Sequence, residues 1–181
     1  MNKRIFDIVF SLFGIIFLGF FILLFWLLAS IDTKSNGLFV QKRIGQFGKL
    51  FKIYKLKSIQ NNSDYISKFG KFIRKSKIDE LPQFFNILIG EMSFVGPRPD
   101  LAGYYDKLEG ENRIILNLKP GLTSLASIKY ANEDEILFKQ ENPLKFNDEV
   151  IFPDKVKINL EYSKKQSFML DLKIIFKTIF R

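Results

Sequence analysis

Residues 75–100 read KSKIDELPQFFNILIGEMSFVGPRPD, and this stretch decides the interpretation of the whole chain. It contains two adjacent carboxylates, Asp79 and Glu80, and farther on Arg98 between two prolines. Carboxylates are ligands for hard divalent cations, and a guanidinium on a rigid backbone suits a phosphate. The stretch therefore predicts phosphate chemistry assisted by a metal ion.

Asp79 and Glu80 are not expected to act as a facing pair, because adjacent helical residues point about 100° apart. One of them can serve as nucleophile or metal ligand while the other adjusts its charge. A structural interpretation is also open, since Ser76-x-x-Asp79 matches a capping box and aspartate is a common N-cap. Pro82 agrees with a helix start, which would also attract phosphate.

The residues available for chemistry are limited, because the 181-residue chain contains neither histidine nor cysteine. This excludes zinc sites built on those residues, cysteine nucleophiles, Ser-His-Asp triads and disulfides. The formal net charge is +9, and between Lys34 and Lys75 eleven Lys/Arg stand against one Asp. Such a distribution suggests an anionic partner: a nucleic acid, a lipid headgroup or a phosphorylated substrate.

Residues 8–29 form an apolar run that only one serine and two glycines interrupt. As a straight helix the run would extend about 33 Å, enough to cross a hydrocarbon core of roughly 30 Å. Lys3 and Arg4 precede it and the basic cluster follows it, so the positive-inside rule places both ends in the cytoplasm. We therefore expect residues 1–34 to form a re-entrant membrane helix, with a single straight span as the alternative.

Residues 35–181 are expected to form an α+β cytoplasmic domain with a small β-hairpin and several amphipathic helices at the membrane surface. A basic amphipathic helix often lies among lipid headgroups, although a soluble helix with a solvated basic face has the same pattern. We expect strands at 38–41 and 50–57 around a turn at 45–48, and then a polar loop at 61–64. A basic helix ending near Lys75 and a helix from Leu81 to Gly90 follow. After a turn at 119–121, we expect a helix opened by Pro153 and ending at Tyr162, and a last helix at 168–180 capped by Ser167.

Six short motifs in this order resemble bacterial sugar transferases of the small monotopic phosphoglycosyl transferase type. The resemblance covers nearly the whole chain, and its DELPQ and GPRP blocks are its most specific parts. The motifs are KRIFD at 3–7, YKLKS at 54–58, IDELPQ at 78–83, MSFVGPRP at 92–99, KPGLT at 119–123 and SFMLD at 167–171.

The resemblance implies a reaction: transfer of a sugar 1-phosphate from a UDP-sugar to undecaprenyl phosphate, at the cytoplasmic face of the bacterial inner membrane. This would be the first membrane step of glycan assembly. Asp79 matches the family's nucleophile, which attacks the β-phosphorus, releases UMP and holds the phosphosugar until the lipid phosphate takes it. Glu80 matches the second member of the catalytic dyad. Mg²⁺ is expected at Asp79, because a cation has to neutralise the charge where anionic groups meet.

Basic residues of the family's site also have counterparts here. Arg98 matches the arginine between the prolines, and we expect it to contact the nucleotide diphosphate; a structural salt bridge is the alternative. Lys57 and Arg74 match basic positions suited to phosphate oxygens, or else belong to a solvated basic face. Asp171 matches a family acid, for which a helix-start role is expected. Trp26 is interpreted as a membrane contact.

Two departures from the family pattern concern the membrane helix and the region after the KPG turn. Gly19-Phe20 stands where family members commonly have Ser-Pro, which breaks the helix into a re-entrant hairpin. Glycine costs a helix about 1 kcal/mol against roughly 3 for proline, so bends at Gly14 and Gly19 are expected to be weaker. Residues 124–130 replace a stretch that is expected to shape the sugar site.

A competing hypothesis is a non-catalytic, membrane-anchored basic binding or scaffold protein. It accounts for the apolar run and the charge, but it gives no role to Asp79, Glu80 or Arg98. The enzyme hypothesis uses all three. Its partners are a UDP-sugar, undecaprenyl phosphate and membrane lipid, without nucleic acid.

Overall fold

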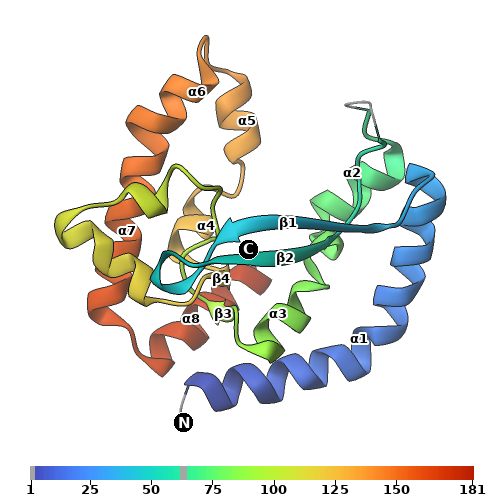
Figure 1. The fold of residues 1–181 in the computed structure, drawn as a ribbon, viewed down its shortest axis with the longest axis horizontal. Coiled ribbons are helices and arrows are strands. Elements are labelled where there is room, and N and C mark those ends of the chain that lie inside the picture. The colour runs from blue at the N-terminus through green and yellow to red at the C-terminus, as the bar shows by residue number, and fades with distance from the viewer. Residues whose placement is uncertain (1–2, 62–64) are drawn as a thin grey trace. The chain divides into compact units, whose positions relative to one another are not determined.

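The computed structural model describes residues 3–61 and 65–181 (Figure 1). The chain divides into two compact units, one from Met1–Arg43 and Leu50–Met92 and the other from Ile44–Lys49 and Ser93–Arg181. The expected polar loop at 61–64 falls outside the described residues except for Asn61.

The first unit begins with helix α1, Lys3–Thr33, whose large apolar side chains are mostly exposed. It is long and apolar enough to cross a membrane, alone among the helices of the described chain. Ser11 Oγ donates to Asp7 O at 2.5 Å, as expected for a side chain bonded back to its own helix. Figure 1 shows α1 as a bent helix, whose first half runs along α3 before the helix turns toward α2.

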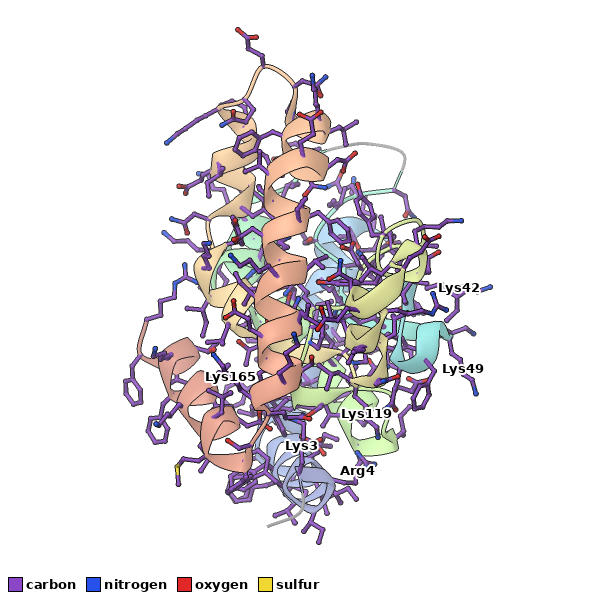
Figure 2. The ribbon with its side chains drawn as sticks, turned by 90° about the vertical axis from the view of Figure 1, so that its left-hand side faces the viewer. Lys3, Arg4, Lys42, Lys49, Lys119 and Lys165 are labelled. Carbon is purple, nitrogen blue, oxygen red and sulfur yellow. The ribbon has the colours of Figure 1, made fainter. Side chains whose placement is uncertain are left out.

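Both ends of α1 are attached to the same unit. At the N-terminal end, the Arg4 guanidinium donates to Ile87 O at 2.6 Å and to Leu88 O at 2.7 Å (Arg4 is labelled in Figure 2). At the other end, Asp32 accepts a hydrogen bond of 2.7 Å from Ser67 Oγ, the N-cap of α2. The two helices that receive these contacts, α2 and α3, follow one another along the chain.

Gly14 lies where α1 packs on α3. A Cβ atom added there would lie 2.6 Å from the ring of Phe84, so the glycine permits close packing of α1 on α3. Gly19 has open space around it. Trp26 Nε1 donates to Asn36 Oδ1 at 3.0 Å, which places this ring at the C-terminal end of α1.

The predicted hairpin is confirmed with small changes at its ends. Strand β1, Leu38–Ile44, is three residues longer than expected, and β2, Leu50–Leu56, pairs with it. A short 3-10 turn, η1 at Gln46–Gly48, joins them, and Gly48 has a positive φ of 74° that favours glycine.

Two helices follow the hairpin, as predicted. Helix α2, Lys68–Lys75, carries the basic amphipathic face. Helix α3, Gln83–Ile89, ends at Gly90, which has a φ of 93° typical of a glycine C-cap. Between them lies the 3-10 turn η2, Ile78–Glu80.

The capping-box interpretation of Ser76 and Asp79 is wrong. Ser76 is the C-cap of α2, and its Oγ donates back to Phe72 O at 2.8 Å. Lys77 occupies the N-cap of η2, so Asp79 lies inside the turn. The carboxylate of Asp79 is therefore not needed to cap a helix.

In the second unit, strand β3, Ser93–Val95, pairs in parallel with β4, Gly121–Thr123. Helix α7, Phe152–Lys165, carries Pro153 in its first turn, and α8, Phe168–Ile179, is capped by Ser167, both as predicted. Asp171 in the first turn of α8 accepts a hydrogen bond of 2.5 Å from Tyr162 OH. The remaining elements are η3 Tyr105–Lys107, η4 Gly110–Asn117, α4 Leu125–Lys129, α5 Glu133–Phe138, α6 Pro143–Phe146 and the π-helical turn η5 Asn147–Ile151.

Candidate active site

A sharp change of chain direction puts the two carboxylates at the start of α3. Lys77 has a φ of 59° and a ψ of 16°, a left-handed conformation that non-glycine residues rarely adopt. It ends α2 and lets the chain enter η2 within two residues. Strained backbone of this kind is common where a fold presents a functional side chain.

Asp79 is a buried carboxylate with one unpaired oxygen. Only 8% of its surface is exposed. Within residues 3–61 and 65–181, its Oδ1 atom has no hydrogen-bond partner. A buried polar atom without a partner costs roughly 1–3 kcal/mol, so its presence points to a ligand or a chemical role.

The surroundings of Asp79 raise its pKa to about 6, chiefly because burial removes water from the carboxylate. The negative charge of Glu80 raises the pKa further. The nearby positive charges of Lys55, Lys77 and Arg74 oppose this shift in that order. At neutral pH the Asp79 carboxylate is therefore mostly ionised, but it takes up a proton at a higher pH than an exposed aspartate does.

Glu80 has a cationic partner on the hairpin. Lys55 Nζ lies 3.2 Å from Glu80 Oε1, and the two side chains are 20% and 8% exposed. The contact is possible because β2 packs against η2. Lys55 thus neutralises one member of the carboxylate pair and leaves Asp79 as the member with an unpaired oxygen.

The two carboxylates fit a site in which Mg²⁺ is held partly by the protein and partly by a substrate. They do not fit a site in which protein side chains supply most of the ligands. In the described part of the chain, no cluster of three or more acidic side chains is available to hold a metal. Mg²⁺ usually takes one or two carboxylates and completes its shell with phosphate oxygens and water. The unpaired Oδ1 of Asp79 is a suitable ligand for such an ion.

The other two basic residues predicted for this part of the site differ in position. Arg74, in the last turn of α2, is exposed and close enough to affect the pKa of Asp79. Lys57 instead donates to Ser35 Oγ at 2.8 Å and to Asn61 Oδ1. The structure therefore places Arg74 near Asp79, and it places Lys57 beside the segment that follows α1.

Arg98 belongs to the second unit, where the backbone on both sides of it is fixed. Pro97 O accepts a hydrogen bond of 2.8 Å from Gly121 N, and Asp100 O accepts one of 2.9 Å from Ile44 N. A Cβ added to Gly121 would clash with Gly96 N, and one added to Gly96 would clash with Lys119 O, so neither position has room for a side chain. The GPRP and KPG motifs thus form one support that presents Arg98 at the surface.

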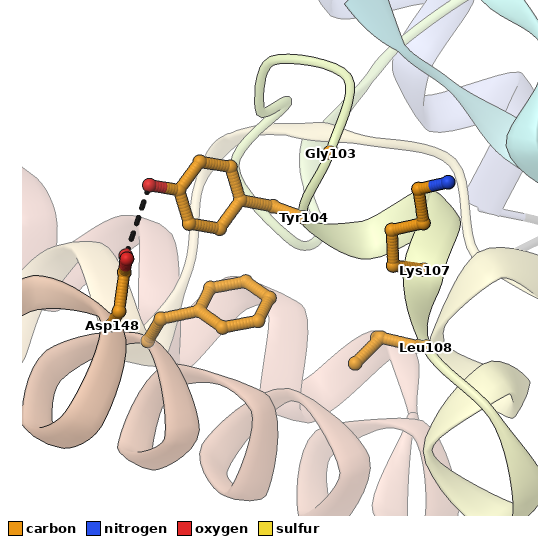
Figure 3. A pocket seen from close by; sticks show the side chains of 6 residues that line it. Gly103, Tyr104, Lys107, Leu108 and Asp148 are labelled. Atoms are coloured by element: carbon orange, nitrogen blue, oxygen red, sulfur yellow. Dashed lines mark hydrogen bonds between the residues drawn. The ribbon is translucent and has the colours of Figure 1, made fainter.

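A cavity of about 450 Å³ lies elsewhere in the second unit (Figure 3). Among its lining residues, Tyr104 OH donates to Asp148 Oδ1 at 3.0 Å, and this hydrogen bond is the main reason that the pKa of Tyr104 is raised. The lining residues, which the sequence did not single out, are Gly103, Tyr104, Lys107, Leu108, Asp148 and Phe152.

Sequence reasoning missed Lys55. It lies two residues before Lys57 in the same motif, and alternation along the strand expected at 50–57 would put both side chains on one face, although β2 ends at Leu56. The signal for a basic face was therefore present. Its pairing with Glu80, 25 residues later, depends on how β2 packs against η2.

Comparisons with known proteins show the family to which the chain belongs. A family model described as bacterial sugar transferase matches residues 1–181. A UDP-glucose:undecaprenyl-phosphate glucose-1-phosphate transferase of Klebsiella pneumoniae is 34% identical, over 99% of this chain and 39% of the relative. The galactosyl transferase CpsE of Streptococcus agalactiae is 33% identical, over 98% of this chain and 41% of the relative. The exopolysaccharide production protein PSS of Rhizobium leguminosarum is 31% identical, over 98% of this chain and 92% of the relative. The chain thus spans about two fifths of the first two relatives and most of the third.

Proposed function

Since this chain belongs to the bacterial sugar transferase family, we propose that it transfers a sugar 1-phosphate from a UDP-sugar to undecaprenyl phosphate. The observation that carries the proposal is the buried Asp79 carboxylate, which has one unpaired oxygen beside a Glu80 neutralised by Lys55. A scaffold protein would have no reason to keep a buried carboxylate in this state, because the arrangement lowers stability.

The proposed reaction has two displacement steps at one phosphorus atom. An Asp79 oxygen attacks the β-phosphorus of the UDP-sugar, a new P–O bond forms, and the bond to UMP breaks. An oxygen of undecaprenyl phosphate then attacks the same phosphorus and breaks the bond to Asp79. The products are UMP and undecaprenyl diphosphate sugar, and the Asp79 carboxylate is regenerated.

Several groups around Asp79 would offset the negative charges of the substrate and of the carboxylate pair. Mg²⁺ held by Asp79 and the diphosphate would neutralise charge that develops on the phosphoryl oxygens. Lys55 keeps Glu80 from adding its full negative charge to the site. Arg74 supplies positive charge at the edge of the turn. In the second unit, the fixed backbone around Arg98 suits a guanidinium that binds the nucleotide diphosphate through two parallel hydrogen bonds.

We further propose that α1 enters and leaves the membrane on the cytoplasmic side of the inner membrane. A straight helix across the bilayer would put its ends about 30 Å apart on opposite faces. The attachments of Arg4 to α3 and of Asp32 to the N-cap of α2 support an arrangement in which both ends stay with one unit. The bend of α1 in Figure 1 supports the same arrangement. UDP-sugars are made in the cytoplasm, so Asp79 must lie there for the reaction to occur.

The function is tested with detergent-purified protein, Mg²⁺, undecaprenyl phosphate and three donors. UDP-glucose, UDP-galactose and UDP-N-acetylgalactosamine are chosen because relatives are named for these sugars. We expect UMP release with at least one donor. Without the lipid acceptor, we expect a single-turnover burst of UMP and a sugar-phosphate mass on the peptide that contains Asp79. Absence of UMP with all three donors would contradict the proposal.

The topology is tested by placing single cysteines at Asn2 and, in a second variant, at Asn36 in this naturally cysteine-free chain. A membrane-impermeant thiol reagent is added to cells with a permeabilised outer membrane. Neither cysteine should react until the inner membrane is opened. Labelling of position 2 alone from the periplasm would establish a full span and leave the chemical proposal intact.

A further inference from the structure

Gln83, the first residue of α3, has a buried amide that the fold leaves unpaired. The residue is only 3% exposed. Its Nε2 donor has no hydrogen-bond partner in the described part of the chain. A buried N–H group of this kind lowers stability by roughly 1–3 kcal/mol, so most folds pair it or place it in water.

Several other side-chain amides of this protein donate hydrogen bonds, including some that are less buried. Asn86, one turn later in α3 and fully buried, donates to Lys52 O at 2.7 Å and to Glu91 Oε2 at 2.8 Å. Four glutamines that are less buried than Gln83 each donate through Nε2 to an oxygen: Gln46 to Asn117 O, Gln60 to Asp32 O, Gln140 to Ile136 O and Gln166 to Tyr162 OH. The same helix thus pairs the buried amide of Asn86 and leaves the buried amide donor of Gln83 unpaired.

The unpaired donor of Gln83 lies close in the chain to the unpaired acceptor of Asp79. Gln83 lies four positions after Asp79, and Leu81 and Pro82 between them both have right-handed helical backbone. The third unpaired atom among residues 3–61 and 65–181 is Nε of Arg43, whose guanidinium donates to Gln41 through another nitrogen. Asp79 and Gln83 thus mark one helical turn as a place built to receive a ligand.

We propose that Gln83 is a catalytic residue, whose amide donates a hydrogen bond to a non-bridging oxygen of the phosphoryl group that Asp79 attacks. This inference rests on the proposed function. The phosphoryl oxygens are the ligand atoms bonded to the phosphorus under attack, so they are the ones a donor one helical turn from the nucleophile can reach. They also offer only acceptors, which matches the unpaired N–H of Gln83.

A neutral amide suits this position better than a cation. A lysine or arginine here would form an ion pair with Asp79 and make the carboxylate a weaker nucleophile. An amide adds no net charge, yet it stabilises the negative charge that grows on the phosphoryl oxygens. Fixed donors of this type act mainly on the transition state, so their loss lowers kcat more than it raises KM.

The experiment compares Gln83→Met with the parent protein in two measurements. Methionine has a similar length and no hydrogen-bonding amide. We expect the apparent Tm to stay equal to the parent value or to rise, because no folded-state hydrogen bond is lost. We expect kcat for transfer to fall by about 100-fold, with KM for the UDP-sugar changed less than about threefold. Gln83→Glu, which puts a second negative charge beside Asp79, should be less active still.

Two control variants separate a catalytic role from a structural one. Asn86→Leu removes the paired amide of the same helix and should lower Tm clearly. Gln140→Met makes the matched substitution in the second unit, at a residue whose amide donates to Ile136 O at 3.2 Å, and should leave kcat unchanged.

Three results would overturn the inference. A Gln83→Met enzyme with the parent kcat would remove Gln83 from the chemistry. A fall in Tm as large as that of Asn86→Leu, with a matching loss of active protein, would make Gln83 structural. A parent protein that releases no UMP from any of the three donors overturns the proposed function itself, and this result is known before any variant is compared.

Discussion

Two buried aspartates, one in each unit, are treated in opposite ways by the fold. Asp171 in α8 is 3% exposed and accepts a hydrogen bond of 2.5 Å from Tyr162 OH in α7. Asp79 in η2 is 8% exposed, and no group in the described chain donates to its Oδ1 atom. Both residues lie in motifs of the family resemblance, which implies a nucleophile role for Asp79 and for which we expected a helix-start role at Asp171. The structure adds a physical difference between the two carboxylates.

The difference teaches how to separate a structural acid from a reactive one. A hydrogen-bonded buried carboxylate contributes to the stability of the ionised folded state. A buried carboxylate without that donor destabilises the fold, and burial raises the pKa of Asp79 to about 6. Substitution of the reactive acid should therefore cost activity and not stability, whereas substitution of the structural acid should do the reverse.

The largest effect is expected from Asp79→Asn. An amide is nearly isosteric with the carboxylate but is not a useful nucleophile, so transfer should fall by at least about 10³-fold. The variant should also be more stable at pH 7.5, by up to about 3 kcal/mol, since two pKa units correspond to roughly that free energy. UMP release and thermal unfolding measure the two quantities on the same preparation.

Retention of more than about a tenth of the parent rate by Asp79→Asn, in protein free of other transferases, would remove Asp79 from the nucleophile role. A lower Tm would show that its carboxylate is stabilised in the fold after all. Either result breaks the contrast with Asp171.

Arg98→Lys is expected to have the next largest effect on activity. This variant tests whether a residue of the second unit contributes to the reaction. Lysine keeps the charge but lacks the planar fork that binds two phosphate oxygens at once. We expect kcat/KM for the UDP-sugar to fall by about 10- to 100-fold with Tm unchanged, because Arg98 is exposed and its backbone is held by other residues. Parent-like kinetics would exclude the proposed bidentate contact.

Much of the fold followed from local patterns. The hairpin, α2, α3, α7 and α8 were predicted because their apolar period, caps and turn glycines act over a few residues. The DELPQ and GPRP motifs also identified the family, which the family model over residues 1–181 confirms, whereas the roles assigned to Asp79, Glu80 and Arg98 stay predictions. The capping-box interpretation failed because it assumed that Lys77 would keep an ordinary backbone conformation. Its left-handed φ of 59° starts η2 at Ile78 and places Asp79 inside that turn, where it caps no helix.

Contacts between distant segments were not predictable in the same way. The pairing of Lys55 with Glu80 needs the packing of β2 on η2, and no local pattern contains it. The close approach of Gly96 to Gly121 depends on the parallel pairing of β3 with β4. Each is fixed by the packing of elements that are far apart in sequence.

The pH dependence tests the electrostatic half of the comparison. The nucleophile must be ionised, so kcat/KM should fall about tenfold per pH unit below a midpoint near pH 6, the pKa of Asp79 in the free enzyme. Stability should change in the opposite sense. Between about pH 4 and pH 6 the folded state keeps a proton that the unfolded chain has lost, so ionisation of Asp79 makes the parent less stable as the pH rises.

The stability advantage of Asp79→Asn should therefore be small at pH 4 and complete above pH 6. Thermal unfolding of both proteins across this range measures it. An advantage that does not change with pH would mean that it does not come from the Asp79 charge. A kcat/KM that stays level down to pH 5 would assign the nucleophile a lower pKa.

The smallest effect on activity is expected from Asp171→Asn. Asparagine still offers an oxygen to Tyr162, but the hydrogen bond loses its charge, and the new amide N–H is buried. We expect a loss of about 1–3 kcal/mol of stability, while kcat per folded molecule changes less than about threefold.

Tyr162→Phe is the matched control, because it removes the donor of the same bond. The double variant should lose less stability than the sum of the single variants, since both act on one interaction. If Asp171→Asn instead lost activity at an unchanged Tm, the second buried aspartate would also be a site residue, and an unpaired oxygen would no longer distinguish the reactive acid from the structural one.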